Sequence, residues 1–127
     1  FNNDATTNYQ VNYYAADGAS FYVSRTTAAF MNLGNSLTED VDSNISASAV
    51  WHIFDINSGK YKTSVSRWSC DKNGTGTYTV GLYAFVWNNQ AAITEIDLNM
   101  EDDDYDTGTM ISLFGVLPSM LTTGTVA

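Results

Sequence analysis

The chain has 127 residues, which fits one domain large enough to bury a core of its own. Its net charge of −9 disfavours binding to nucleic acid or to an anionic membrane, because both depend on Lys and Arg side chains. A single cysteine, Cys70, excludes an intramolecular disulfide, and no apolar run is long enough for a transmembrane helix. Because the chain begins at Phe1 without a methionine, we expect further residues before it.

The composition predicts β structure. The sequence contains 8 Tyr, 6 Phe and 3 Trp together with many Thr, Val and Ser residues, and these side chains suit a pleated, half-buried surface. Residues with high helix propensity are scarce, and turn-forming residues recur roughly every ten positions, which is typical of sandwiches and barrels.

The N-terminal half contains three predicted strands, at residues 9–14, 21–25 and 45–56. Asp17 and Gly18 predict the turn between the first two, and Asn57 to Gly59 predict the turn after the third. Strand 45–56 alternates in its first half but is apolar on both faces in its second half, so we expect that half to lie between two layers.

The C-terminal half contains four more predicted strands, at residues 61–70, 78–87, 92–100 and 109–117. The first two are joined across Asn73 and Gly74, whose residue types favour a two-residue type I′ turn. Pro118 ends the last strand, because proline cannot donate to a ladder. The chain as a whole gives about eight strands, with at most a turn or two of helix at residues 26–33, and we predict an all-β fold with a single jelly-roll-like β-sandwich over residues 1–127.

The most acidic segment, residues 101–106, is a candidate calcium site because Ca²⁺ binds several carboxylate oxygens at once. It lacks the glycine and the distal glutamate of an EF-hand loop, so a solvated hairpin tip is the preferred interpretation. The single histidine, His52, has no neighbours at metal-ligand spacing and is expected to be partly buried or interfacial. We therefore predict no metal site.

Glu95 and Asp97 are the candidate catalytic carboxylates. They share one face of a predicted strand about 7 Å apart, which is a separation that glycosidases use. That face alternates with an apolar one, so ordinary solvent exposure explains both residues. The sequence has neither a nucleophile elbow nor a phosphate-binding loop, and Cys70 is expected to be a quiet, buried thiol. We predict no catalytic residue and no cofactor.

The many aromatic residues can fill a core or form an interface. Three are expected in the core: Trp51, Phe85 and Phe114. Four tyrosines are candidate interface residues: Tyr9, Tyr13, Tyr14 and Tyr105.

Residues 87–98 (WNNQAAITEIDL) and 108–116 (GTMISLFGV) carry a recognisable pattern. It resembles the closing pattern of many structural proteins of tailed-bacteriophage virions, "W-x-N-x-x-A-I-T-x-I-x-L", then an aromatic residue (here Tyr105), then "G-[ST]-x-I-x-L-[YF]-G-[VI]". The match spans 30 residues, from 87 to 116, and Phe114 stands where Tyr is commoner.

The resemblance implies that these two segments are the final strands of a β-sandwich. On physical grounds we also expect Ile111, Leu113 and Val116 to bury the last strand in the core. The resemblance also implies a non-enzymatic virion protein and names no catalytic residue. We predict a capsid decoration or cement protein that binds across subunits of the major capsid protein, forms a homotrimer, and is located on the capsid surface after assembly in the host cytoplasm.

Two alternatives stay open. The first is a receptor-binding or fibre-head domain that contacts host-surface glycans, because the pattern does not separate head, tail and fibre proteins. The second is a small β-sandwich carbohydrate hydrolase that uses Glu95 and Asp97.

Overall fold

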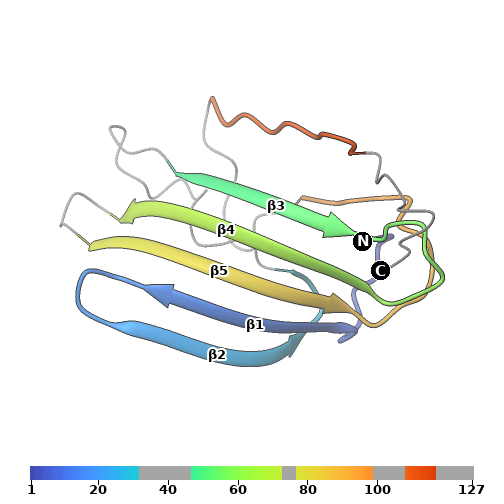
Figure 1. Ribbon diagram of the computed structural model, residues 1–127, viewed down its shortest axis with the longest axis horizontal. Helices are drawn as coiled ribbons and strands as arrows, with labels where there is room; N and C mark the ends of the chain where they lie inside the picture. The colour runs from blue at the N-terminus through green and yellow to red at the C-terminus, as the bar shows by residue number, and fades with distance from the viewer. Residues whose placement is uncertain (32–46, 73–76, 99–107, 117–127) are drawn as a thin grey trace, which may run out of the picture.

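The computed structural model describes residues 1–31, 47–72, 77–98 and 108–116. Five strands form one antiparallel sheet: β1 (Tyr9–Ala16), β2 (Phe21–Ala28), β3 (Ser48–Phe54), β4 (Lys62–Lys72) and β5 (Thr77–Trp87). The strand order is β2-β1-β5-β4-β3, so β2 and β3 are the two edges (Figure 1). The described residues contain no helix, and the all-β prediction is confirmed.

The five strands correspond to five of the predicted ones, with ends that differ by a few residues. The turn after β1 forms where Asp17 predicts it: its backbone N–H donates to the carbonyl of Ser20, and its carboxylate accepts from the backbone N–H groups of Ala19 and Ser20. Such side chain to backbone bonds replace the ladder where the chain reverses.

The hairpin between β4 and β5 is confirmed, but its predicted loop length is wrong. Lys72 pairs with Thr77, so four residues connect the strands, where the Asn73-Gly74 dipeptide predicted two. These four residues lie outside the described ranges.

The two last predicted strands do not pair in this structure. Residues 92–98 and 109–116 belong to no ladder among the described residues, which hold one sheet and no second layer. The predicted burial of the last strand is also wrong, because Ile111, Leu113, Phe114 and Val116 are all exposed. Alternation predicts that a segment can form a strand, but it does not say which edge the segment pairs with, and neither segment pairs with β2 or β3, the two edges of the described sheet.

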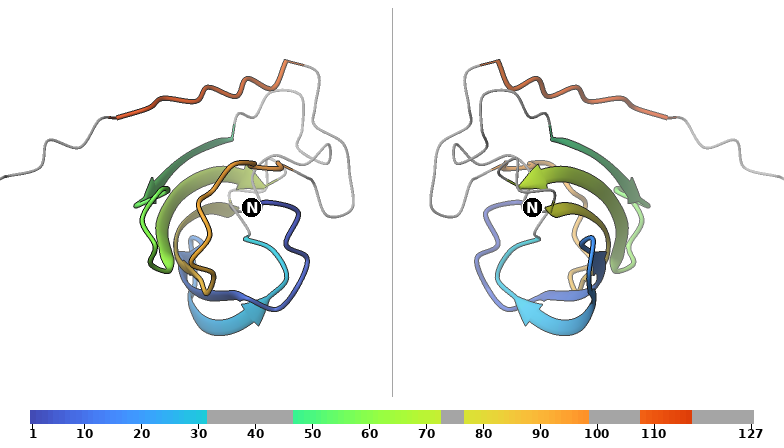
Figure 2. Two further views of the ribbon diagram at one scale, coloured as in Figure 1. Left: turned by 90° about the vertical axis from the view of Figure 1, so that its right-hand side faces the viewer. Right: turned by 90° about the vertical axis from the view of Figure 1, so that its left-hand side faces the viewer.

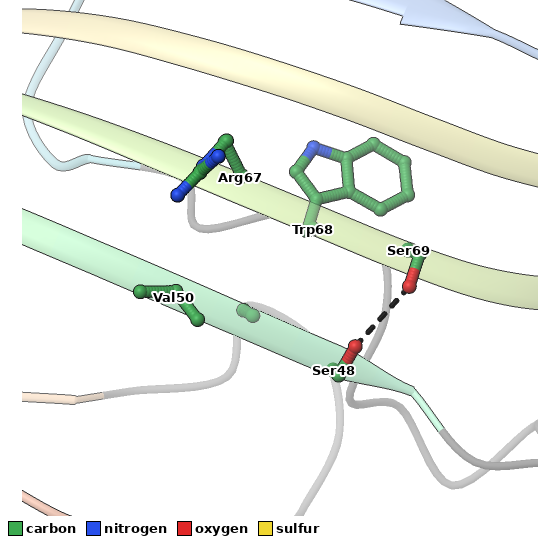
Figure 3. Close-up of a pocket in the computed structure, with 6 residues that line it drawn as sticks. Ser48, Val50, Arg67, Trp68 and Ser69 are labelled. Atoms are coloured by element: carbon green, nitrogen blue, oxygen red, sulfur yellow. Dashed lines mark hydrogen bonds between the residues drawn. The ribbon is translucent and has the colours of Figure 1, made fainter.

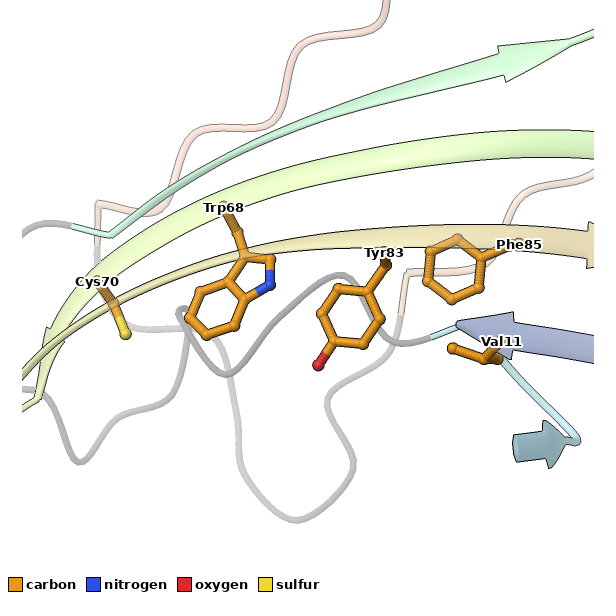
Figure 4. Close-up of a cluster of buried hydrophobic side chains, with 5 residues drawn as sticks. All are labelled: Val11, Trp68, Cys70, Tyr83 and Phe85. Atoms are coloured by element: carbon orange, nitrogen blue, oxygen red, sulfur yellow. The ribbon is translucent and has the colours of Figure 1, made fainter. Parts of the chain in front are cut away.

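The sheet is curved, and its concave side carries the core (Figure 2). Figure 4 shows the five core side chains pointing to the same side of the sheet: Val11, Trp68, Cys70, Tyr83 and Phe85. Of the residues expected in the core, Phe85 is buried, while Trp51 is half-buried with its ring stacked on that of Phe1 at 5.4 Å between centroids.

Gly81 makes room for the core tryptophan. It pairs with Trp68 across β4 and β5, and a Cβ atom at position 81 would lie 2.5 Å from the Trp68 indole nitrogen. The indole therefore lies flat over the neighbouring strand, where any larger residue would push it away.

The inner face of β4 is polar in its first half. Lys62, Ser64 and Ser66 are fully buried there, opposite the large rings of β5. Small serine side chains leave space for those rings, as alternating sizes do in well-packed layers. The Lys62 ammonium donates hydrogen bonds to the backbone carbonyls of Ser58, at 2.7 Å, and Gln90, at 3.3 Å, and also to that of Lys60. Its charge is thus satisfied by backbone oxygens that gather at the end of the sheet.

Candidate interaction surface

The convex side of the sheet is an apolar surface without a covering layer among the described residues. The pairing register places on this side the side chains that alternate with the core residues. We call it the outer face, and its most exposed apolar members come from four strands: Tyr14, Phe21, Val23, Val50, Phe54 and Val80. Phe21 is 90% exposed and Val23 is 72% exposed, which is unusual for adjacent members of one sheet face.

Arg67 lies between two shallow hollows on this face. One, of about 280 Å³, is lined by Ser48, Val50 and Ser69 beside Arg67, and the hydroxyls of the two serines lie 3.1 Å apart (Figure 3). The other, of about 410 Å³, lies over β1 and is lined by residues of β2, β1, β5 and β4. A guanidinium between two apolar hollows can bind a planar carboxylate while its neighbours bury apolar groups.

Two of the five cationic side chains of the protein, Arg25 and Arg67, lie on the outer face. The chain as a whole has a net charge of −9. The face is therefore suited to a partner surface that combines apolar groups with acidic ones.

The four predicted interface tyrosines are dispersed. Tyr14 lies on the outer face and is exposed. Tyr13 points to the concave side, half-buried against Tyr83 at 5.4 Å between ring centroids. Tyr9 is 1% exposed, and its hydroxyl accepts a hydrogen bond from the amino group of Phe1, so its ring is part of the packed interior. Tyr105 lies outside the described residues.

Sequence reasoning missed the aliphatic and phenylalanine members of this face, notably Phe21, Val23 and Val80. A signal for them exists in residues 78–87, where apolar residues occupy both faces of one strand. One face of that strand carries the core rings, so the other had to be either a second buried face or an exposed apolar surface. The structure has the exposed surface.

The candidate chemical residues do not converge. Glu95 is exposed and accepts a hydrogen bond from the side chain of Asn3 at 2.8 Å, Asp97 is exposed, and neither lines either hollow. His52 is exposed on the outer face beside Phe54, so the expected partial burial is wrong, while the alternative of an interfacial position stays a prediction. Cys70 is buried as predicted. The segment 101–106 lies outside the described residues, and within them no cluster of three metal-ligating side chains occurs.

Comparisons of the chain with protein-family models, with curated proteins and with solved structures give no match. Among the described residues no helix is long and apolar enough to span a membrane. The outer face is therefore interpreted from its own chemistry.

Proposed function

We propose that this protein is a non-enzymatic structural component of a tailed-bacteriophage virion, and specifically a capsid decoration protein. The observation that carries the proposal is the outer face, an exposed apolar surface with Arg67 near its middle. Covering a surface of this kind by a partner lowers the free energy, and such binding needs no reactive group. The resemblance of residues 87–116 to virion proteins supplies the biological setting.

The proposed partner is the major capsid protein. The outer face would lie across the joint between two of its subunits, with Arg25 and Arg67 paired to acidic groups and Phe21 and Val23 covered. Each contact would be modest in strength, and a trimeric decoration protein would bind through three of them at once, which raises its avidity. Cyclic symmetry also matches the local symmetry of a capsid.

The proposal includes the complete jelly-roll-like sandwich of about eight strands. The described sheet provides five of them. Residues 92–98 and 109–116 have strand-like sequences and would provide further strands when they pair with an edge.

Quantitative mass spectrometry of purified virions tests the proposal. A copy number comparable with that of the major capsid protein is expected, together with density on the capsid surface in electron cryo-microscopy. A copy number like that of the tail fibres, with density at the fibre tips, would assign the chain to a receptor-binding head. Absence from the particles would overturn any virion role.

A binding assay tests the surface itself. Capsids that lack the protein are incubated with the wild-type chain, with Arg67→Glu, and with Arg25→Glu as the second outer-face cation. Both charge reversals are expected to weaken binding, because each places a carboxylate opposite acidic partner groups. Lys60→Glu, an exposed cation outside the strands, is the matched control and is expected to bind like the wild type. Equal binding by all four proteins would remove the outer face from the proposal.

A further inference from the structure

Residues 109–116 form an extended segment that we call the C-terminal arm. Its sequence, TMISLFGV, has no charged residue, and it pairs with no strand among the described residues. The apolar side chains Met110, Ile111, Leu113, Phe114 and Val116 are between 57% and 92% exposed. Gly108, with a φ of +98°, turns the chain just before the arm, and Figures 1 and 2 show the arm lying beyond the β3 edge of the sheet and separate from it.

The arm has the properties of a β-strand that lacks a partner. Its apolar residues lie on both sides of an extended backbone, so a water-exposed arm leaves two apolar faces and a row of backbone N–H and C=O groups unpaired. A segment of this composition is stabilised when it adds to the edge of a sheet, where the ladder pairs its backbone and neighbouring side chains cover both faces.

Strand β3 is an edge that can accept it. In the five-stranded sheet β3 pairs with β4 alone. Its sequence, SAVWHIF, contains no Lys, Arg, Asp, Glu or Pro, which are the residues that commonly protect an exposed edge. The opposite edge, β2, carries Arg25 near its centre and a run of threonines, so it is the better protected of the two.

The arm and β3 match in length and in chemistry. The arm has eight residues and β3 has seven. Both are apolar on both faces: β3 presents Val50 and Phe54 on the outer face, and Trp51 and Ile53 on the concave side. Pairing would therefore place apolar side chains beside one another on each face of the sheet, without bringing two charges together.

We propose that the C-terminal arm of one copy adds to β3 of a second copy of this chain as a sixth strand. The second copy is the occupant because each molecule carries both the donor and the acceptor, while its own arm is exposed and unpaired, separate from its own sheet. Donor and acceptor are different surfaces, so the exchange closes either as a reciprocal pair or as a head-to-tail ring.

A ring of three would give the trimer of the proposed decoration protein. The inference itself needs only self-association and does not depend on a virion role. A chain that self-associates through its arm but is absent from virions would leave this inference intact and overturn the proposed function. A monomeric chain found on capsids would support the proposed function and overturn this inference.

The first experiment measures self-association of the full chain by sedimentation velocity, together with hydrogen–deuterium exchange of the arm amides at several protein concentrations. The wild type is expected to form a discrete oligomer, with arm protection that rises as the oligomer forms. Ser112→Pro removes a backbone donor from the arm without removing an apolar side chain, and is expected to weaken association by about tenfold or more. Ser112→Ala keeps the donor and is the matched control.

Ser112→Pro leaves the five-stranded sheet untouched, and a circular dichroism spectrum and thermal midpoint like those of the wild type are expected for the unassembled chain. Three results overturn the proposal: a wild-type monomer up to the solubility limit, an oligomer that is unchanged by Ser112→Pro, or arm protection that does not depend on concentration. The last result would mean that the arm pairs within its own chain.

The second experiment maps the acceptor by disulfide formation between two different variants in one mixture. One carries Leu113→Cys or Phe114→Cys in the arm, and the other carries His52→Cys on β3. Cross-linked heterodimers are expected for the β3 position, and Arg25→Cys on the β2 edge is the matched control. Cross-linking at β2 but not at β3, or at neither edge, would overturn the assignment of β3.

Discussion

The indole N–H of Trp87 donates a hydrogen bond to the carboxylate of Asp4 at 2.8 Å, which fastens the first residues of the chain to the end of β5. Trp87 is fully buried, and its ring also packs edge-on against Phe1 at 5.4 Å between centroids. Asp4 accepts further hydrogen bonds from Thr6 and from the side chain of Asn8. One carboxylate therefore organises the N-terminal segment over the aromatic end of the concave face.

The first prediction concerns acid stability. The hydrogen bonds from Asn8, Thr6 and Trp87 hold the pKa of Asp4 well below its ordinary value of 3.8. Below pH 3.8 Asp4 becomes protonated in the unfolded chain while it stays ionised in the folded protein. The stabilisation by the Asp4 charge is therefore complete above pH 3.8 and is lost as the pH falls toward the folded pKa.

The test is Asp4→Asn, which keeps the shape of the side chain and removes its charge. At neutral pH the variant is expected to lose about 1 kcal/mol, less than is usual for hydrogen bonds to a charged group, because this carboxylate is open to water. Urea unfolding measured from neutral to acidic pH should show the two stabilities converging in acid. Parallel stability curves would contradict the role of the Asp4 charge. Asp17, whose pKa is also lowered by hydrogen bonds from Tyr22, Ala19 and Ser20, is present in both proteins and cancels in the difference.

The second prediction concerns the buried ammonium of Lys62. Lys62→Met keeps most of the apolar stem but leaves the carbonyls of Ser58, Lys60 and Gln90 without their shared donor. A loss of about 1–3 kcal/mol of unfolding free energy is expected, because the side chain is fully buried and water cannot easily replace it.

Lys60→Met is the matched control for Lys62→Met, since the Lys60 side chain is exposed two residues away. Its effect is expected to stay within about 0.5 kcal/mol, as for most surface substitutions. Denaturant titration gives the unfolding free energy of both variants. Equal losses would show that Lys62 stabilises the fold only by its positive charge and not by its hydrogen bonds to the three carbonyls.

The five strands could be predicted from the sequence because their signals are local. Alternating apolar residues and turn formers such as Asp17 and Asn57 act on neighbouring residues, and the structure places the strands accordingly. The inner face of β4 could not be predicted in this way. Lys62, Ser64 and Ser66 are buried because rings from strands distant in sequence surround them, and hydropathy alone would place Tyr61, Thr63 and Val65 inside.

The candidate surface could also be predicted only in part from the sequence. The apolar members of the outer face alternate with core residues, but the sequence does not say whether a second layer covers them. The pairing of residues 109–116 is undetermined for a related reason: alternation identifies a strand but not the chain that supplies its partner. Residue type alone favoured tyrosines as contacts, and the fold placed Tyr9 in the interior instead.

The third prediction concerns the contact between Gly81 and Trp68. Gly81→Ala would place a Cβ atom within 2.8 Å of three atoms of a buried, rigid indole, so the ring must shift out of its packed position. A destabilisation of roughly 1–3 kcal/mol is expected, as for overpacked cores. Near-ultraviolet circular dichroism should also change, because the environment of Trp68 changes.

Gly59→Ala provides the comparison for Gly81→Ala. A Cβ atom at position 59 would meet nothing within 4 Å, so its effect on the unfolding free energy is expected to stay within about 0.5 kcal/mol. If Gly81→Ala were as well tolerated as Gly59→Ala, the close packing of Trp68 over β5 would be contradicted.

The fourth prediction concerns the apolar outer face. Phe21→Ser removes the most exposed ring of that face, and because the ring is 90% exposed it contributes little to the fold. The unfolding free energy is expected to change by less than about 0.5 kcal/mol, while binding to capsids that lack the protein should weaken, since the covered ring no longer supplies apolar burial. Phe30→Ser, an exposed ring outside the five strands, is the matched control and should bind like the wild type. A variant that unfolds readily would instead mean that Phe21 is buried in the folded protein, and an unchanged affinity would mean that the partner binds elsewhere.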